Sequence, residues 1–399
     1  MGLTAIVAAI IGSLLAPVPV AAGGIDVILN EADHSFAQHV TFTLHATSDA
    51  EIVRIYVFFH AAHDEQTGKA DVSPENPAAQ VSVRYAHDVE RFPLPPFADI
   101  TFWWQIEDAV GNQLDTPPQT FRYTDNRFVW RQLSAGGISV HWVEGQGDPT
   151  FGQTALDIAQ ASVKDANAEL RAPLPDPLDI FIYNSESNLR AATVLTGRTW
   201  VGAQARPELG AVVIAVPPAE GYTSRMKRYL PHEITHLLVY QLVTPEGYQY
   251  VPEWLDEGLA TANERLPTPE YALALQEAHE ADRLLSLEEL CIPFSPDPRT
   301  AVLSYAQSAS VARFIRERYG AGGIRELLSV YADGASCASG VEEALDISLN
   351  RLESVWGMSL EPRAHWRAWV DRAGVWLALW LLSLLVAVPM IGGTRRRSS

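Results

Sequence analysis

The first part of the chain alternates apolar and polar positions with the period of two that β-strands have. Val40 to Leu44 (VTFTL) places an apolar residue at every second position, as a strand with one buried face does. Turn-rich stretches such as Ser73 to Pro77 separate it from further segments of the same kind: Ile52 to His60, Val81 to Tyr85 and Ile100 to Ile106. Several short strands at this spacing predict a β-sandwich over residues 23–125.

From about residue 126 the pattern mixes strand and helix periods. Thr154 to Leu170 carries apolar residues at helical spacing, between segments that read as strands: Ile138 to Trp142, Leu178 to Tyr183 and Val212 to Val216. After about Thr223 the pattern is mostly helical, through Tyr271 to Leu284, Ala309 to Tyr319 and Ile324 to Tyr331. The predicted fold class is α+β: an immunoglobulin- or fibronectin III-like sandwich, then an α+β domain over residues 126–362 with a helical C-terminal part.

Two apolar runs lie at the ends of the chain. Leu3 to Leu15 is uncharged and too short to span a bilayer comfortably, and small residues precede Gly23, so we expect a signal peptide at residues 1–22. No lysine or arginine precedes this run, and a buried N-terminal helix or strand is the alternative. Ala373 to Ile391 contains no charge and is long enough for one transmembrane helix, with a buried core helix as the alternative.

The charges that flank the second run are nearly balanced. Arg395, Arg396 and Arg397 follow it, in a tail at residues 392–399 that we expect in the cytoplasm, but arginines also precede it. The export signal decides the orientation. We therefore expect a single-pass protein of the cell membrane, with residues from about 24 to 370 outside the cytoplasm.

The net charge bears on the partners of the chain, and the cysteine content fits the expected location. The formal net charge of −19 would repel phosphate backbones, which excludes nucleic acid as the expected partner. Cys291 and Cys337 are the two cysteines of the chain. In an oxidising compartment they could form a disulfide, and two free buried thiols are the alternative.

The stretch Pro231 to His236 (PHEITH) carries the pattern H-E-x-x-H. On a helix, residues four apart differ by about 40° in azimuth and by about 6 Å along the axis, so His232 and His236 would share one face and one metal ion. Glu233 points about 100° away from His232 and would stand beside the open coordination position. Two core histidines with hydrogen-bond partners are the alternative.

A catalytic zinc site needs three protein ligands, so a third must come from elsewhere in the chain. The stretch Val251 to Ala260 (VPEWLDEGLA) follows at a distance that allows a second helix, and Glu257 is its candidate ligand. We expect Glu253 and Asp256 to be solvated charges at the start of that helix.

The two motifs together resemble those of the gluzincins, the thermolysin and aminopeptidase N superfamily, whose second motif reads W-L-x-E-G-x-A. The resemblance is nearest to the peptidase-MA-like metallohydrolases of bacteria and covers roughly Arg127 to Leu360. It implies that Glu257 is the third zinc ligand and that Glu264 orients a ligand histidine, with an exposed helix charge as the alternative for Glu264. It also implies that Tyr305 donates to the oxyanion, with a packed core tyrosine as the alternative.

These residues predict a zinc-dependent metallopeptidase in which Glu233 acts as general base on peptide or protein substrates. The G-x-M-E-N motif by which aminopeptidases hold a free amine is absent, which favours an endopeptidase. Trp200 to Gln204 and Ala211 to Val216 predict a hairpin that either offers an edge to a peptide strand or is an ordinary internal hairpin. The alternative function is an inactive or weakly active surface-binding or sensing protein that acts through its β-sandwich.

Overall fold

The structure is a computed structural model that describes residues 24–64, 66–144, 149–193, 202–266 and 268–360. It divides into two compact units, one with the residues up to 153 and 177–222, the other with 154–176 and those from 223 onward. The predicted division between residues 125 and 126 falls inside the first unit and stays a prediction. The predicted signal peptide and the predicted helix at 373–391 lie outside the described residues. Among the helices that the structure describes, none has the length and apolarity needed to cross a membrane.

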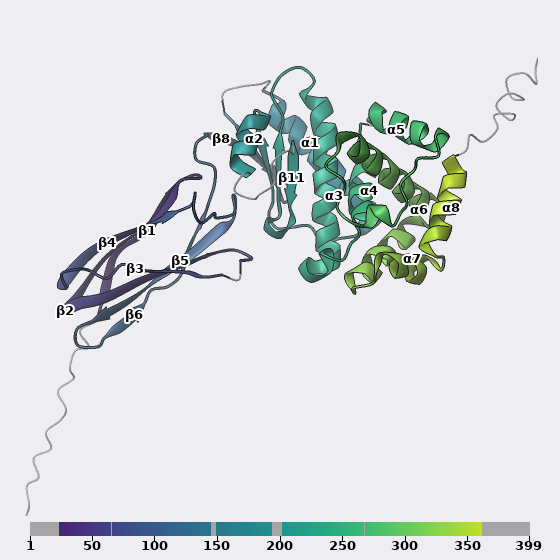
Figure 1. Ribbon diagram of the computed structural model, residues 1–399. Coiled ribbons are helices and arrows are strands. Elements are labelled where there is room, and N and C mark those ends of the chain that lie inside the picture. The colour runs from purple at the N-terminus through teal and green to yellow at the C-terminus, as the bar shows by residue number, and fades with distance from the viewer. Residues whose placement is uncertain (1–23, 65, 145–148, 194–201, 267, 361–399) are drawn as a thin grey trace, which may run out of the picture. The chain divides into compact units, whose positions relative to one another are not determined.

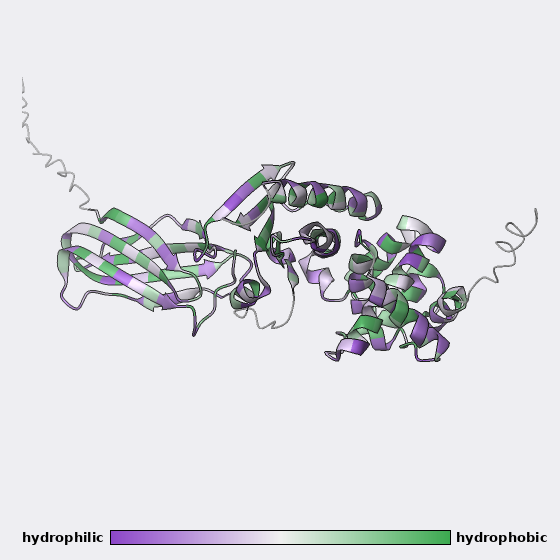
Figure 2. Ribbon diagram, turned by 90° about the horizontal axis from the view of Figure 1, so that it is seen from above, coloured by the Kyte–Doolittle hydropathy of each residue, from purple (hydrophilic) through white to green (hydrophobic). Residues whose placement is uncertain are grey.

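The N-terminal part of the first unit is an antiparallel, sandwich-like sheet of seven strands (Figure 1). Buried and solvent-facing positions alternate along its strands, which gives them the colour banding of Figure 2. The predicted strands at Val40 to Leu44 and Ile52 to His60 form one long strand, which pairs with β1 and β4 along its first part and with β3 and β5 along its second. The strands are β1 (Asp26–Ser35), β2 (His39–Ala61), β3 (Gly68–Asp71), β4 (Ala78–Asp88), β5 (Asp99–Asp108), β6 (Gln113–Asp115) and β7 (Gln119–Arg122).

The second sheet of this unit has five strands in the order β11-β12-β10-β9-β8. Its three inner strands are parallel, and its two edge strands run antiparallel to their neighbours. All six residues of β10 are buried, as expected for an inner parallel strand that is covered on both faces. The predicted hairpin is present as β11 and β12, although Trp200 and Val201 of the predicted first strand lie outside the described residues. The bounds are β8 (Trp130–Ala135), β9 (Ile138–Val143), β10 (Leu178–Tyr183), β11 (Ala203–Arg206) and β12 (Ala211–Ala215), with α2 (Glu186–Thr193) after β10.

The two sheets of the first unit share one hydrophobic core. Phe97 from the loop before β5 stacks on Phe181 of β10, with ring centroids 3.9 Å apart. Beside this contact Asp125 is fully buried. Its carboxylate accepts from the Nε and Nη2 atoms of Arg127, at 2.8 and 2.6 Å, and from the hydroxyl of Tyr183 at 2.8 Å. A buried carboxylate is tolerated only with such partners, so this cluster ties the sandwich to the second sheet.

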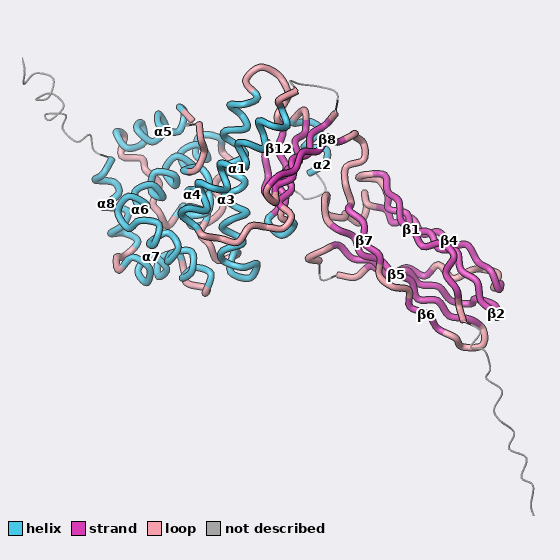
Figure 3. Tube along the Cα trace, turned by 180° about the vertical axis from the view of Figure 1, so that it is seen from behind, coloured by secondary structure: helices cyan, strands magenta, loops and turns pink. Residues whose placement is uncertain are grey.

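Helices make up the later part of the described chain (Figure 3). Two of them are interrupted: α3 at Thr244, which has φ 66°, and α6 at Gly320, which has φ 69°. The predicted helices at Ala309 to Tyr319 and Ile324 to Tyr331 therefore lie in the two halves of α6, which meet at Gly320, where glycine accepts a left-handed φ without steric cost. The bounds are α1 (Phe151–Leu170), α3 (Tyr222–Tyr248), α4 (Glu253–Ala262), α5 (Pro269–Glu280), α6 (Pro298–Ala332), α7 (Cys337–Leu345) and α8 (Leu349–Leu360).

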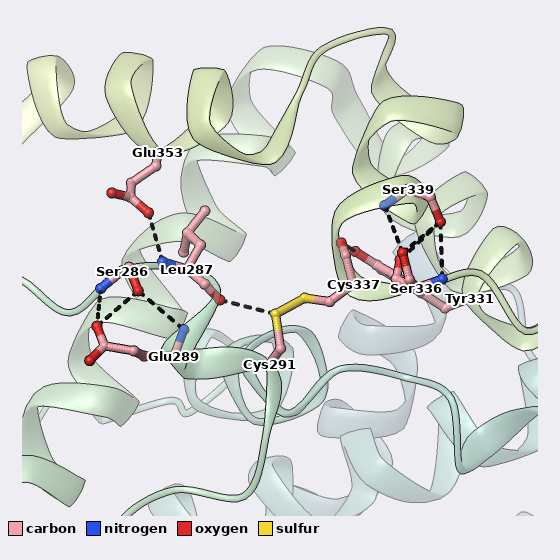
Figure 4. The surroundings of a disulfide bond; sticks show 9 residues. All are labelled: Ser286, Leu287, Glu289, Cys291, Tyr331, Ser336, Cys337, Ser339 and Glu353. Carbon is pink, nitrogen blue, oxygen red and sulfur yellow. Dashed lines mark hydrogen bonds between the residues drawn. A yellow bond between two sulfur atoms is a disulfide. The ribbon is translucent and has the colours of Figure 1, made fainter.

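A disulfide joins Cys291, at the end of a 3₁₀ turn, to Cys337, the first residue of α7 (Figure 4). The two Cα atoms lie 6.1 Å apart, and the bond closes a loop with a sequence separation of 46. Close by, the backbone N–H of Leu287 donates to the carboxylate of Glu353 in α8, at 2.7 Å. The segment before α6 is thus fastened to both C-terminal helices, and the chain-entropy model gives the disulfide about 4 kcal/mol of stabilisation.

The buried cluster around Asp125 yields a testable expectation for the first unit. Tyr183→Phe removes one hydrogen bond to a buried carboxylate and keeps the ring, so the free energy of unfolding should fall by about 1.5–3 kcal/mol. Chemical denaturation of the full chain, followed by tryptophan fluorescence, measures this change. Tyr85→Phe is the matched control, because the Tyr85 contacts seen in the structure are those of its ring, and it should change stability by much less. Equal effects of the two variants would contradict the assignment.

Candidate metal centre

The H-E-x-x-H stretch lies in the middle of α3, with both imidazoles on one face and ring centroids 5.0 Å apart. Pro231, just before it, is an interior helix residue and lacks the N–H that would bond to the carbonyl four residues earlier. That carbonyl belongs to Lys227, and it accepts instead from the backbone N–H of Arg265, at 2.9 Å. The proline therefore frees an acceptor that fastens the segment after α4 to α3.

Helix α4 brings Glu257 to the two histidines. Its Oε2 atom lies 3.2 Å from Nε2 of His232 and 3.6 Å from Nε2 of His236. Trp254 and Leu255, both fully buried, anchor the first turn of α4. Gly258, which directly follows Glu257, faces α6 so closely that a Cβ atom there would lie 2.6 Å from the carbonyl oxygen of Ser308. The apolar anchor and the close helix contact hold the glutamate in place.

A carboxylate stands behind each histidine. Oε1 of Glu264 lies 3.3 Å from Nδ1 of His232, and the Glu264 side chain is 5% exposed, so it is not an exposed helix charge. Oδ2 of Asp256 lies 3.0 Å from Nδ1 of His236 and accepts from the hydroxyl of Tyr248, at 2.7 Å. The expectation that Asp256 is a solvated charge is wrong, because the first turn of α4 faces α3 and turns this side chain inward.

The carboxylates dominate the electrostatics of the site. Burial alone lowers the pKa of His232, but the contacts of its ring with the Glu257 and Glu264 carboxylates and the nearby charge of Glu233 outweigh it and raise the pKa to about 9. Burial is likewise outweighed at His236, where the charges of Asp256 and Glu257 raise the pKa well above its usual value. The surroundings therefore favour positive charge at this point.

This donor set fits a divalent metal ion. Two imidazole nitrogens and one carboxylate oxygen, from His232, His236 and Glu257, lie within 4.8 Å of one another. The Oε2 atom of Glu257 is buried, and it accepts no hydrogen bond from any residue that the structure describes. A buried carboxylate oxygen without a donor is costly unless a cation satisfies it. Two histidines and one glutamate are also a ligand set that zinc takes in catalytic sites.

Two further candidate residues lie beside this set. Glu233 is buried at 7% exposure, close enough to His232 and Tyr305 for its charge to raise the pKa of both. The ring of Tyr305, on α6, has its centroid 6.4 Å from that of His232 and packs against Tyr271 and Phe294. Burial, and then the charge of Glu257, raise the pKa of Tyr305, so its hydroxyl keeps its proton and remains a donor.

A family model of the Peptidase MA superfamily matches residues 158–362, just over half of the chain and the part that contains this site. The chain belongs to the Peptidase MA superfamily. The resemblance to peptidase-MA-like metallopeptidases that the two motifs indicated is thereby confirmed. A comparison with curated proteins found no match.

Solved structures similar to this Peptidase MA chain include an aminopeptidase N family protein from Idiomarina loihiensis. It is 9% identical, with a TM-score of 0.41 over 80% of this chain and 74% of that one. A catalytically inactive OgpA from Akkermansia muciniphila, solved with an O-glycopeptide substrate, is 8% identical, with a TM-score of 0.21 over 25% of this chain and 29% of that one. The family assignment comes from the sequence match.

The sequence patterns did not indicate the roles of some residues around the site. Tyr248 and Asp256 support His236, and Thr235 and Asn263 are linked by a hydrogen bond between α3 and the end of α4. The one available signal was position: Asp256 directly precedes the predicted ligand Glu257, and Thr235 directly precedes His236. Their partners lie on another helix, so periodicity within one element does not reveal them.

The close contact at Gly258 predicts the effect of one methyl group. Gly258→Ala should force α4 away from α6 and lower the free energy of unfolding by about 1–3 kcal/mol, as overpacking does. Denaturant titration of the full chain measures it. Gly322→Ala is the control, because a Cβ at this helical position meets nothing within 4 Å and should leave stability unchanged or slightly raised. If Gly258→Ala were as stable as this control, the contact would not hold α4.

Proposed function

We propose that this metallopeptidase is a zinc enzyme that hydrolyses peptide bonds, with His232, His236 and Glu257 as its ligands. The observation that carries the proposal is the convergence of two imidazoles and one carboxylate oxygen without a donor within 4.8 Å of one another. When bound, zinc supplies Lewis acidity and makes hydroxide accessible near neutral pH. Asp256 and Glu264 would fix the orientation of the two imidazole rings from behind.

The protein's own groups supply the proton transfers. Glu233, as general base, takes a proton from the attacking water and passes it to the leaving amine. Burial of this carboxylate supports that role, since a base shielded from bulk water acts on the water held beside it. The hydroxyl of Tyr305, kept protonated by burial and the charge of Glu257, donates to the oxygen of the scissile carbonyl as negative charge develops there.

We further propose an endopeptidase that is anchored to the membrane by residues 373–391 and acts outside the cytoplasm. The absent aminopeptidase motif, the apolar runs at both ends and the Cys291–Cys337 disulfide support this proposal. Digestion of a peptide library by the full chain, with and without a chelator, tests the activity and its position in the peptide. Stoichiometric zinc without turnover of any peptide would favour a binding protein that acts through its β-sandwich.

The assignment of Glu233 as general base predicts a variant that still binds zinc but no longer hydrolyses peptides efficiently. Glu233→Gln should keep full zinc occupancy, because no ligand is lost, while peptide hydrolysis falls by about 10²- to 10⁴-fold. Metal analysis and turnover of a fluorogenic peptide on the same preparation measure both quantities. Turnover at the wild-type rate would remove Glu233 from the mechanism.

The ligand assignment predicts the opposite pattern. Glu257→Ala should lose zinc, because two imidazoles alone hold the ion weakly, and hydrolysis should fall with it. Zinc per chain after dialysis against a weak chelator measures the loss. Glu253→Ala is the matched control, one turn earlier on the same helix and outside the ligand set, and it should retain its zinc. Unchanged zinc content in Glu257→Ala would exclude this residue as a ligand.

A further inference from the structure

The turn that follows α4 is held against α3 by three successive residues. Asn263 donates from Nδ2 to Oγ1 of Thr235, at 3.1 Å. Glu264 places Oε1 3.3 Å from Nδ1 of His232. Arg265 donates its backbone N–H to the carbonyl of Lys227, at 2.9 Å. The carboxylate behind His232 thus stands between two hydrogen bonds that join the same two segments.

The Asn263 side chain is itself clamped from the other side. Its Oδ1 atom accepts from Nη2 of Arg316, at 3.0 Å. Arg316 is held in turn by two hydrogen bonds to the carboxylate of Glu169 in α1, at 2.8 and 2.7 Å, a bidentate pair with fixed geometry. The amide of Asn263 therefore has one orientation that satisfies both neighbours, with the oxygen toward Arg316 and the nitrogen toward Thr235.

Thr235 is the last side-chain acceptor in this chain of hydrogen bonds. It is fully buried, directly precedes the ligand His236, and donates its own hydroxyl to the carbonyl of Pro231, at 2.7 Å. The hydroxyl oxygen is left to accept from Asn263. Asn263 in turn directly precedes Glu264. The hydrogen bond between Thr235 and Asn263 consequently links the neighbour of the ligand His236 to the neighbour of Glu264, the carboxylate behind His232.

We propose that Asn263 is a positioning residue for the metal site. Clamped by Arg316, it holds the end of α4 on Thr235 so that Glu264 stays on Nδ1 of His232. The inference rests on the proposed zinc site and deepens it. Groups that orient a ligand histidine typically change metal affinity by about 10- to 100-fold, and a residue one step further out should change it by less.

The test is the rate at which zinc leaves the folded full chain, followed with a chromophoric chelator. Thr235→Val keeps the shape of the side chain but removes the acceptor, and Asn263→Leu removes the donor. Each should speed zinc dissociation about three- to tenfold, and the double variant should add little to the larger single effect. Thr235→Ser restores the hydroxyl and should behave as the wild type.

Ser310→Ala is the control, because it removes a hydrogen bond between α8 and α6, from the Trp356 indole to Ser310 at 3.1 Å, which involves neither Asn263 nor Thr235. It should leave zinc dissociation unchanged. Wild-type dissociation rates in both Thr235→Val and Asn263→Leu, or an equal acceleration in Ser310→Ala or Thr235→Ser, would overturn the inference. A wild-type chain that takes up no zinc would instead overturn the proposed zinc site, so the two failures are distinguishable.

Discussion

The site depends on the burial of carboxylates around two imidazoles at the contact between α3 and α4. Glu257 lies between the two Nε2 atoms, Glu264 and Asp256 lie behind the rings, and Glu233 lies beside them. Burying this much negative charge is costly unless positive charge compensates it. The protonated imidazoles or a bound cation can supply that charge. The arrangement therefore favours positive charge at the point where the three donor atoms converge.

Holding these groups together requires two helices to keep a fixed distance, and the structure achieves this with backbone features. Pro231 frees a carbonyl for the segment after α4, and Gly258 lets α4 approach the backbone of α6. Helix interiors usually avoid proline and glycine. At these two positions, however, the missing N–H of Pro231 and the missing side chain of Gly258 allow a contact that another residue would prevent. Local helix stability is reduced at these two positions, and the contact between helices is stronger for it.

The first unit shows a similar use of a buried charge. Asp125 joins the sandwich to the second sheet through Arg127 and Tyr183, inside a continuous apolar core. Because the sandwich contributes residues to that core, it covers one side of a sheet whose inner strand β10 is buried along its whole length. The sandwich is thus part of the folding unit that contains the five-stranded sheet, whatever ligand it binds.

The sequence by itself determined the type and approximate place of most strands and helices, because burial on one face leaves a period of two or of 3.6. The sequence also determined that His232 and His236 lie on one face of a helix with Glu233 beside them, since spacing within one helix fixes which side chains share a face. It pointed to Glu257 through a second motif. Tertiary structure decided the rest. Whether Asp256 is solvated or lies behind His236, and whether Asn263 reaches Thr235, depends on how α4 packs against α3. Single polar contacts between helices leave no period in either segment, so only the packed structure reveals them.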